Sequence, residues 1–527
     1  MSEVDKLEEY RLQVSERVDQ EKEVKIPKKP ESDSNEPDID FVRRCYMANE
    51  VGDSLLYNYL YRDQFIYNIV SGRWMYYHGP HWDIDYHNKA KAAAEGVVNQ
   101  YLRLLEPIEE QLGKLTDSKD DAAARKRLNY QKKTLIERLN RLRSDRGRNS
   151  MLNCAVSNKY PLTIHPDDLD QQPWLFPCKN GILNLQTGDF REGLPSDYLT
   201  VASPTEWKGI NAPCPNWEKF LNEVLDNNQE VIGYLQKILG YAITGLKTER
   251  LFVVLYSPHG QNGKGTLIEV LYNILGKLAL PIETELLMSQ KFGKSSGSAS
   301  PDIVALKGKR LIWASETEER NSFAAGKIKL MSGGDPLTGR GISDKDYTTF
   351  NPTHLLFLLC NNLPKAPAKD SAFWERIKVF LFPYSFVNLP TQPHQKKRNG
   401  DLLQELETES SGILAWMARG TKRYQEEGLI PPQKILDDSL DYRSHEDDIQ
   451  EFIDANCHVD FDDASVENRC GAKEIYKLFR DWWEENNSTK AMNQKDFSDQ
   501  LQLKGFKKIK SSGVFYSFIR LALSLGN

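Results

Sequence analysis

The stretch LFVVLYSPHGQNGKGTLIEVLYNILG, residues 251–276, decides the fold of this chain. Its first six residues, 251–256, form an apolar run that predicts a buried strand, and its last ten, 267–276, have the spacing of an amphipathic helix. A glycine-rich loop joins the two. Strand, loop and helix in this order predict an α/β core with a parallel sheet.

The glycine-rich loop predicts a phosphate site. Phosphate needs backbone N–H groups that no Cβ shields, and it gains from a helix N-terminus. Lys264 is placed to reach the β- and γ-phosphates of ATP, and Thr266 to offer its hydroxyl to Mg²⁺. Pro258 stands where the usual pattern has its first glycine, so a plain glycine-rich turn with a solvated lysine is the alternative. The predicted nucleotide-binding residues are Gly260, Gln261, Asn262, Gly263, Lys264, Gly265 and Thr266.

A second strand is predicted within KRLIWASETEE, residues 309–319, and ends in acidic residues. Carboxylates at a strand end suit Mg²⁺ and the water that attacks the γ-phosphate. Glu316 is the favoured catalytic and metal-binding residue, and Glu318 is its substitute. The alternative is an acidic helix start whose glutamates only cap the next segment.

Two further residues follow in chain order. Asn361 ends the apolar run 355–360, where its amide can orient water beside the γ-phosphate; the alternative is a plain turn. Arg376 precedes another strand, and an arginine at such an edge can reach the site of a neighbouring subunit. The alternative for Arg376 is a local salt bridge with Glu375 or Asp370.

Composition and charge restrict the class of protein and its cellular location. The chain has 527 residues and a formal charge of −6, and residues 1–40 alone hold 13 acidic and 7 basic side chains. This segment predicts a disordered acidic tail, which leaves a neutral body. No apolar run is long enough to cross a bilayer. Neither an export signal nor a pattern of paired cysteines is present, so we expect a cytoplasmic protein, in a bacterial host, with seven reduced and buried cysteines.

The regions on either side of the core have distinct patterns. Residues 41–225 predict a mixed α/β region containing a helical arm, 88–148, whose leucines recur every seven residues. Ten basic side chains against three acidic ones in 121–150 allow a DNA contact there. A helical extension is predicted for 396–440. Three helical runs and a terminal hairpin in 441–527 indicate a winged helix.

The ordered motifs resemble those of superfamily 3 helicases of the poxvirus, phage and plasmid primase-helicase type. The resemblance rests on segments that follow one another within about 120 residues, and on two flanking segments. They are GQNGKGT, ASETEE, GGDPLTGRGISDKDYTTFNP, LLCNNLP and AFWERIKVF, flanked by FPCKNGILNL and GILAWMARG. The resemblance covers roughly residues 45–440. It implies an AAA+ core in 226–395 that assembles as a hexameric ring.

The resemblance also implies a role for each motif. Lys264 and Thr266 match the Walker A lysine and hydroxyl, Glu316 the Walker B acid, Asn361 the sensor and Arg376 the arginine that acts in the neighbouring subunit. The pair Arg340 and Lys345 matches a hairpin that points into the ring channel, where cations follow single-stranded DNA. Priming is not expected, although Asp83-Ile84-Asp85 and Asp38-Ile39-Asp40 have the minimal acid spacing of a primase metal site.

Four functional classes follow. The favoured one is a DNA helicase for the replication of a phage, plasmid or other mobile element, acting on single-stranded and forked DNA beside a primase or replication protein. The others are an origin-binding initiator that remodels DNA, a nucleotide phosphotransferase, and a structural ring without hydrolysis. The sensor asparagine and the hairpin cations count against a phosphotransferase, which needs no channel.

Overall fold

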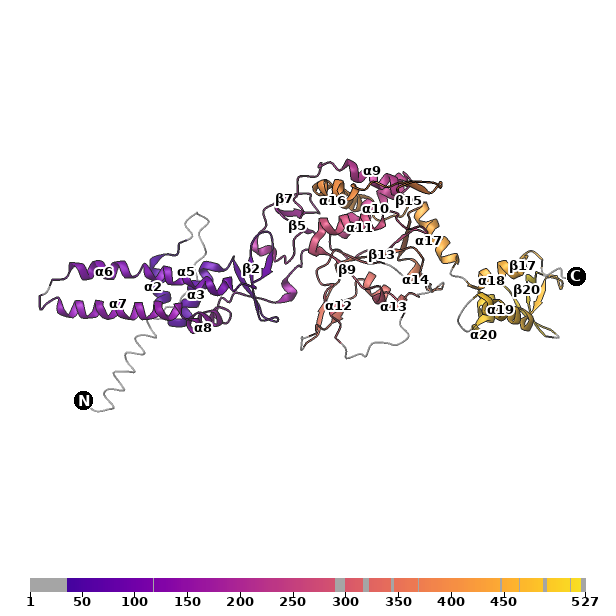
Figure 1. Ribbon diagram of the computed structural model, residues 1–527. Coiled ribbons are helices and arrows are strands. Elements are labelled where there is room, and N and C mark those ends of the chain that lie inside the picture. Colours follow the sequence, from indigo (N-terminus) through magenta and orange to yellow (C-terminus); the bar gives the residue numbers. More distant parts are fainter. Residues whose placement is uncertain are drawn as a thin grey trace.

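The computed structural model describes residues 36–116, 118–289, 299–315, 322–342, 346–367, 369–445, 448–463, 465–486, 491–511 and 513–522. Figure 1 shows a central sheet between an N-terminal group of helices and a small C-terminal group of elements. The predicted tail, 1–40, lies almost wholly outside the described residues. Where the description begins, Asp38 already caps helix α2 (Ile39–Met47), whose Phe41 and Val42 are buried.

The core is a sheet of five parallel strands in the order β14-β8-β13-β10-β9. All six residues of β13 are buried, as expected for a strand with covered faces. The predicted α/β core with a parallel sheet is therefore confirmed. The strands are β8 (Phe252–Tyr256), β9 (Ala279–Pro281), β10 (Leu311–Ser315), β13 (Leu355–Cys360) and β14 (Ile377–Leu381).

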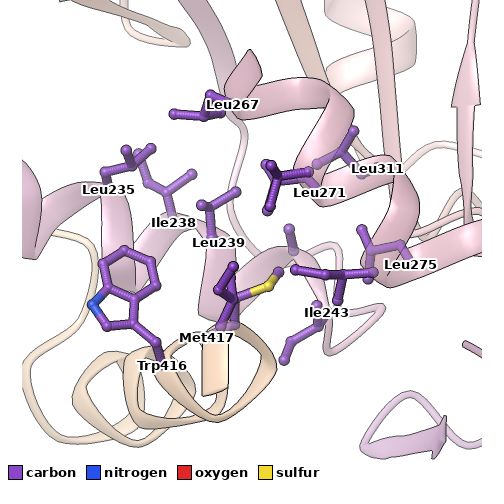
Figure 2. Packing of buried hydrophobic residues seen from close by; sticks show 14 of the residues in the cluster. Leu235, Ile238, Leu239, Ile243, Leu267, Leu271, Leu275, Leu311, Trp416 and Met417 are labelled. Carbon is purple, nitrogen blue, oxygen red and sulfur yellow. The ribbon is translucent and has the colours of Figure 1, made fainter. Parts of the chain in front are cut away.

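One face of the sheet is covered by helices far apart in the sequence. Figure 2 shows leucine and isoleucine side chains of α10 between those of α11 and the Trp416 and Met417 side chains of α16. Gly240 and Gly420 permit this close crossing, because a Cβ at either position would lie about 2 Å from the facing backbone: 2.2 Å from Thr421 N and 2.0 Å from Gln236 O, respectively. The predicted extension thus contributes to the core. The helices on this face are α9 (Pro215–Val224), α10 (Gln229–Ala242), α11 (Lys264–Leu275), α15 (Leu402–Thr408) and α16 (Ser410–Glu427).

The opposite face packs against shorter elements and a hairpin. Their buried side chains form a second cluster with Phe252, Leu356 and Leu358 of the sheet. Outside the sheet, β15 (Ser385–Val387) and β16 (Gln395–Lys397) form a pair. The elements of the opposite face are α12 (Pro301–Val304), α13 (Ala325–Ser332), the antiparallel strands β11 (Leu337–Gly339) and β12 (Thr348–Phe350), α14 (Ser371–Trp374) and α17 (Gln433–His445).

The N-terminal region differs from the predicted single arm. The chain reverses at 115–121, where the Asp121 carboxylate accepts hydrogen bonds from the backbone N–H and the hydroxyl of Thr116 (2.8 and 2.6 Å). Leu135, Leu139 and Leu142, which belong to the predicted repeat, pack instead into a local core with α3 and α5. The helices are α3 (Asn49–Tyr61), α4 (Lys89–Ala92), α5 (Ala94–Leu102), α6 (Leu105–Lys114), α7 (Ala122–Arg143) and α8 (Asp145–Ala155), with strands β1 (Phe65–Asn68), β2 (Arg73–Tyr77), β3 (Trp82–Ile84) and β4 (Thr163–Ile164).

A short connecting region joins the N-terminal region to the core. It contains two hairpins, formed by β5 (Leu175–Cys178), β6 (Gly181–Asn184) and β7 (Phe190–Arg191). The hydroxyls of Ser203 and Thr205 donate to the carbonyl of Ile274 (2.5 and 3.0 Å), near the end of α11. The connecting region is therefore attached directly to the helix that begins at the glycine-rich loop.

The C-terminal group forms a separate aromatic core around Phe452, Phe479 and Phe497. Its three helices lie where they were predicted, and its main sheet has the order β18-β20-β19. A winged helix stays our interpretation of this arrangement. The elements are α18 (Asp448–Asn456), β17 (Cys457–Val459), β18 (Arg469–Gly471), α19 (Ala472–Asn486), α20 (Gln494–Leu503), β19 (Lys508–Lys510), β20 (Val514–Ser517) and β21 (Ile519–Leu521).

The prediction that all seven cysteines are buried is wrong for two of them. All seven are free and five are buried, but Cys154 and Cys457 are partly exposed. Among the described residues, no helix combines the length and the apolar character that a membrane span requires.

Candidate nucleotide site at the carboxyl edge of the sheet

The loop between β8 and α11 has a backbone that requires glycine. Gly263 precedes the first residue of α11 with φ of 88°. A Cβ at this position would lie 2.8 Å from Val224 Cγ1 and 3.2 Å from Phe220 Cε2, so a side chain would displace helix α9. Gln261 also has a positive φ, 55°. The loop is therefore held in one conformation by its own backbone and by α9.

Lys264 and Asn361 meet although 97 positions separate them. The Lys264 ammonium donates a hydrogen bond to Asn361 Oδ1 at 2.8 Å. Parallel pairing of β8 with β13 causes this contact, because Tyr256 and Cys360 lie opposite each other and both strands end at the same edge. The Asn262 amide donates to the His259 carbonyl and lies 3.5 Å from Asn361 Oδ1. Two of the predicted motifs therefore form one polar site.

The electrostatic state of Lys264 is unusual. The residue is 5% exposed, and burial lowers the pKa of its ammonium to about 8. Among the described residues, no carboxylate forms a salt bridge with Lys264. A buried cation whose partner is a neutral amide gains strongly from an anion, so the site suits a phosphate group.

A cavity of about 630 Å³ opens beside Lys264. Of the seven predicted nucleotide-binding residues, four line it, and so does the predicted sensor Asn361. The other three, Gly260, Gly263 and Thr266, lie in the loop and in the first turn of α11 without reaching its wall. The lining residues are Gln261, Asn262, Lys264, Gly265, Ile268, Glu269, Tyr272, Trp313, Ser315, Leu359, Cys360, Asn361 and Asn362.

Among the lining residues that were not predicted, Glu269, Tyr272 and Trp313 extend the cavity. Glu269 and Tyr272 follow Gly265 at intervals of four and three residues, so they lie on the same face of α11. This spacing was visible in the sequence. Trp313 comes from β10, and its ring meets that of Tyr272 edge-on with centroids 5.5 Å apart. An acidic side chain and an aromatic pair therefore extend the cavity along α11.

The predicted acid lies outside the described residues. Glu316 and its substitute Glu318 belong to 316–321, directly after β10, and Lys345 belongs to 343–345. The last described residue before the acids, Ser315, lines the cavity. The catalytic and metal-binding roles of Glu316, and the part of Thr266 in a metal site, stay predictions.

Arg376 lies at the other edge of the sheet from Lys264. It immediately precedes Ile377, which pairs with Phe252 at the start of β8, whereas the phosphate loop follows the end of β8. Its side chain is buried, and its guanidinium donates to the Ala372 carbonyl. This position, at the opposite ends of the strands from the glycine-rich loop, argues against a direct role in the same chain's candidate nucleotide site. A role in a neighbouring subunit stays a prediction.

The predicted DNA-binding hairpin is present as the antiparallel pair β11 and β12. Arg340 directly follows β11, and its guanidinium lies 5.9 Å from the centroid of the Tyr347 ring. Its backbone N–H donates to Ser300 Oγ at 3.1 Å. Ile342, between Arg340 and Tyr347 in the sequence, is 83% exposed. The hairpin thus presents a cation and an apolar side chain.

The two acid pairs considered for priming have structural partners. Asp85 accepts hydrogen bonds from the N–H groups of Lys89 and Ala90 at the start of α4. In the other pair, Asp38 caps α2 and Asp40 forms an ion pair with Arg43 at 2.6 Å. These contacts give three of the four carboxylates a structural role that requires no metal ion.

Comparisons with known proteins agree with the predicted family resemblance. Residues 54–226 match the family model described as D5 N terminal like. The chain is 28% identical to "Putative helicase L207/L206" of Acanthamoeba polyphaga mimivirus, over 64% of this chain and 35% of that protein. It is 24% identical to "Putative helicase 022R" of Frog virus 3 (isolate Goorha), over 61% of this chain and 40% of that protein. The chain thus spans less than half the length of these relatives.

Among solved structures, the A form apo structure of the NrS-1 C terminal region has a TM-score of 0.47 and 11% identity, covering 86% of this chain and 96% of that one. The predicted resemblance to helicases of the primase-helicase type is confirmed by the D5 N terminal like match and the viral relatives. The expected bacterial host has no support, because the relatives come from viruses whose names refer to an amoeba and a frog.

Proposed function

From the D5 N terminal like region and the relatedness to viral proteins named helicases, we infer that this chain is the motor of an ATP-dependent DNA helicase that acts in viral replication. The observation that carries the proposal is the contact between Lys264 and Asn361 beside an open cavity. It joins a phosphate-binding lysine to an amide that can position water. Phosphoryl transfer depends mainly on such positioning and on charge stabilisation.

In this proposal the loop and α11 hold the phosphates of ATP. Lys264 moves its hydrogen bonds from Asn361 to the β- and γ-phosphates, and the freed Asn361 amide then orients the attacking water. Mg²⁺, when bound, neutralises charge that develops on the phosphate oxygens. Thr266 and Glu316 are the residues proposed to hold it. Glu316 also accepts the proton of the attacking water.

We propose a ring in which sites are shared, with Arg376 as the residue that completes a neighbour's site. An arginine at the sheet edge away from the phosphate loop is positioned to complete a neighbour's site only if subunits pack edge to edge. A hexamer is the assembly we propose. The ring directs β11 and β12 toward a central channel, where Arg340 and Lys345 follow the phosphates of single-stranded DNA.

The lowered pKa of Lys264 gives this proposal a pH signature. A lysine is cationic below its pKa, so the free protein loses the phosphate-binding charge as pH rises through about 8. We expect the Kd for ATP to be about tenfold higher at pH 9 than at pH 7, since each unit above the pKa removes about nine tenths of the remaining cation. Titration with a fluorescent ATP analogue measures this. In Lys264→Arg, whose charge persists, the Kd should be flat; an equal rise would identify another group as the cause.

The function itself is tested by comparing wild-type ATP hydrolysis with and without single-stranded DNA, beside strand displacement on a forked duplex. We expect DNA to stimulate hydrolysis severalfold and the fork to be unwound. An initiator remains the second candidate, because Lys507, Lys508 and Lys510 are exposed in the C-terminal group, where they can contact duplex phosphates. Duplex binding without DNA-stimulated hydrolysis or unwinding would favour the initiator.

A further inference from the structure

The hairpin of β2 and β3 carries a cluster that the proposed helicase chemistry does not use. Tyr76 pairs with Asp83 and Tyr77 with Trp82, so residues 78–81 form the connecting loop. Side chains alternate between the faces of a strand. Trp82 points into a small core, where it is 1% exposed, and Asp83 therefore points to the other face.

Three potential metal ligands gather on that outer face. One ligand atom from each of His78, His81 and Asp83 lies within 4.8 Å of the others. The two imidazole rings are 4.7 Å apart, and the His78 ring stacks on Tyr76 at 5.2 Å. His81 Nδ1 is buried without a hydrogen-bond partner among the described residues. An imidazole nitrogen without a partner is available to a metal.

Contacts behind the hairpin hold the three ligands in place. The Trp82 indole N–H donates to the Pro195 carbonyl at 2.9 Å, and its backbone N–H donates to the Leu199 carbonyl at 2.7 Å. Gly193 lies so close that a Cβ there would be 2.8 Å from both Pro80 and the Tyr77 hydroxyl. The ligands therefore lie on a supported hairpin, and small side-chain rotations suffice to bring their atoms to the roughly 3.3 Å separation of a tetrahedral site.

We propose that His78, His81 and Asp83 bind one divalent transition-metal ion of the zinc class. Two imidazoles and a carboxylate suit zinc and disfavour magnesium, which prefers oxygen ligands and keeps its waters. His78 is exposed, so water completes the coordination. Asp83 already accepts a hydrogen bond from the Ile84 N–H through one oxygen, and its carboxylate has a second for the metal.

The position of the site gives it a structural consequence. Lys277, which follows α11 in the 3₁₀ turn Gly276–Leu278, is close enough to interact electrostatically with His81. The metal therefore binds beside the end of the helix that starts at the phosphate loop, and it fixes the hairpin there. The nearby lysine opposes a cation, so we expect a Kd on the order of 1 μM rather than the tighter binding of a four-ligand site.

The test uses the full chain without a histidine tag, stripped with chelator and kept free of nucleotide. Calorimetric titration with Zn²⁺ should show one site per chain, and Co²⁺ should give the visible absorption of a tetrahedral site. His78→Ala, His81→Ala and Asp83→Asn should each weaken binding at least about tenfold, because even an outer-shell partner contributes that much. His87→Ala removes an exposed histidine on the same segment and should bind like wild type.

Thermal unfolding separates loss of the site from misfolding. Zn²⁺ should raise the Tm of wild type and of His87→Ala but not of His81→Ala, whereas all three metal-free proteins should melt alike. Absence of a wild-type zinc site, or equal affinity in His81→Ala, would overturn the proposal. Equal affinity in His81→Ala would indicate that the cysteines bind the zinc instead. Neither result depends on ATP or DNA, so helicase activity is tested separately.

Discussion

The Lys264→Ala protein is expected to lose ATP hydrolysis by a factor of about 100 or more, and most of its affinity for ATP. The reason is the position of the ammonium, which is buried at the cavity and bonded to a neutral amide. Removing one charged group that stabilises a developing anion typically lowers kcat by about 10² to 10³. A coupled assay of phosphate release and titration with a fluorescent ATP analogue measure both effects.

The control for this variant is Lys422→Ala, which removes an exposed lysine from α16, far from the loop in sequence. It should hydrolyse ATP like wild type. Circular dichroism should show the same helix content in both variants, because the Lys264 side chain contributes no salt bridge among the described residues. Hydrolysis above one tenth of the wild-type rate in Lys264→Ala would remove the lysine from the chemistry.

Glu316→Gln separates binding from turnover at the same site. A glutamine retains the size of the side chain but cannot accept the proton of the attacking water. We expect ATP to bind with near wild-type affinity while turnover falls about 100-fold. Turnover near the normal rate would transfer the role to Glu318.

The sequence was sufficient for those parts of the site that depend on local pattern and strand order. A run of apolar residues ending in a polar one identifies the end of a buried strand. This rule placed Asn361 after one strand and the glycine-rich loop, with Lys264, after another. The role predicted for Arg376 stays a prediction, and its burial and its bond to Ala372 were not predictable, because they depend on how α14 packs.

Long-range packing was not predictable in the same way. Gly240 and Gly420 each look like ordinary helix glycines, and only the crossing of α10 and α16 explains them. The leucine repeat of 128–142 predicts one continuous helical arm, because a seven-residue repeat does not specify which segment the helix packs against. The turn at Asp121 lets α6 and α7 pack side by side, which Figure 1 shows.

Side chains whose role depends on a residue from another element were also not predictable from the sequence. Trp313 lies within a quoted motif, but its place in the cavity depends on Tyr272 from another element. His78 and His81 lie in the loop between β2 and β3. Their proximity to Asp83 follows from the register of β2 and β3, which two short strands do not specify in advance.

The second large effect is expected for Lys345→Ala, which should abolish unwinding while basal ATP hydrolysis continues. The family resemblance assigns Lys345 to the channel hairpin and no contact to nucleotide. If successive hairpins pull on DNA phosphates, force passes through this cation, and chemistry and motion become separable. We expect strand displacement to fall at least about tenfold, and most of the stimulation by single-stranded DNA to disappear.

The comparison with Arg340→Ala and Lys422→Ala makes the result specific to the hairpin. Arg340 lies beside Tyr347 where the strands of the hairpin meet its connecting loop, so its loss should also lower basal hydrolysis if it supports the ring. Lys422→Ala should unwind normally. Running the assays at two salt concentrations adds a second criterion, because phosphate contacts weaken as salt rises and Lys345→Ala should show a shallower salt dependence of DNA affinity. Full unwinding by Lys345→Ala would exclude this lysine from translocation, and the exposed Ile342 would then be the next side chain of the hairpin to test.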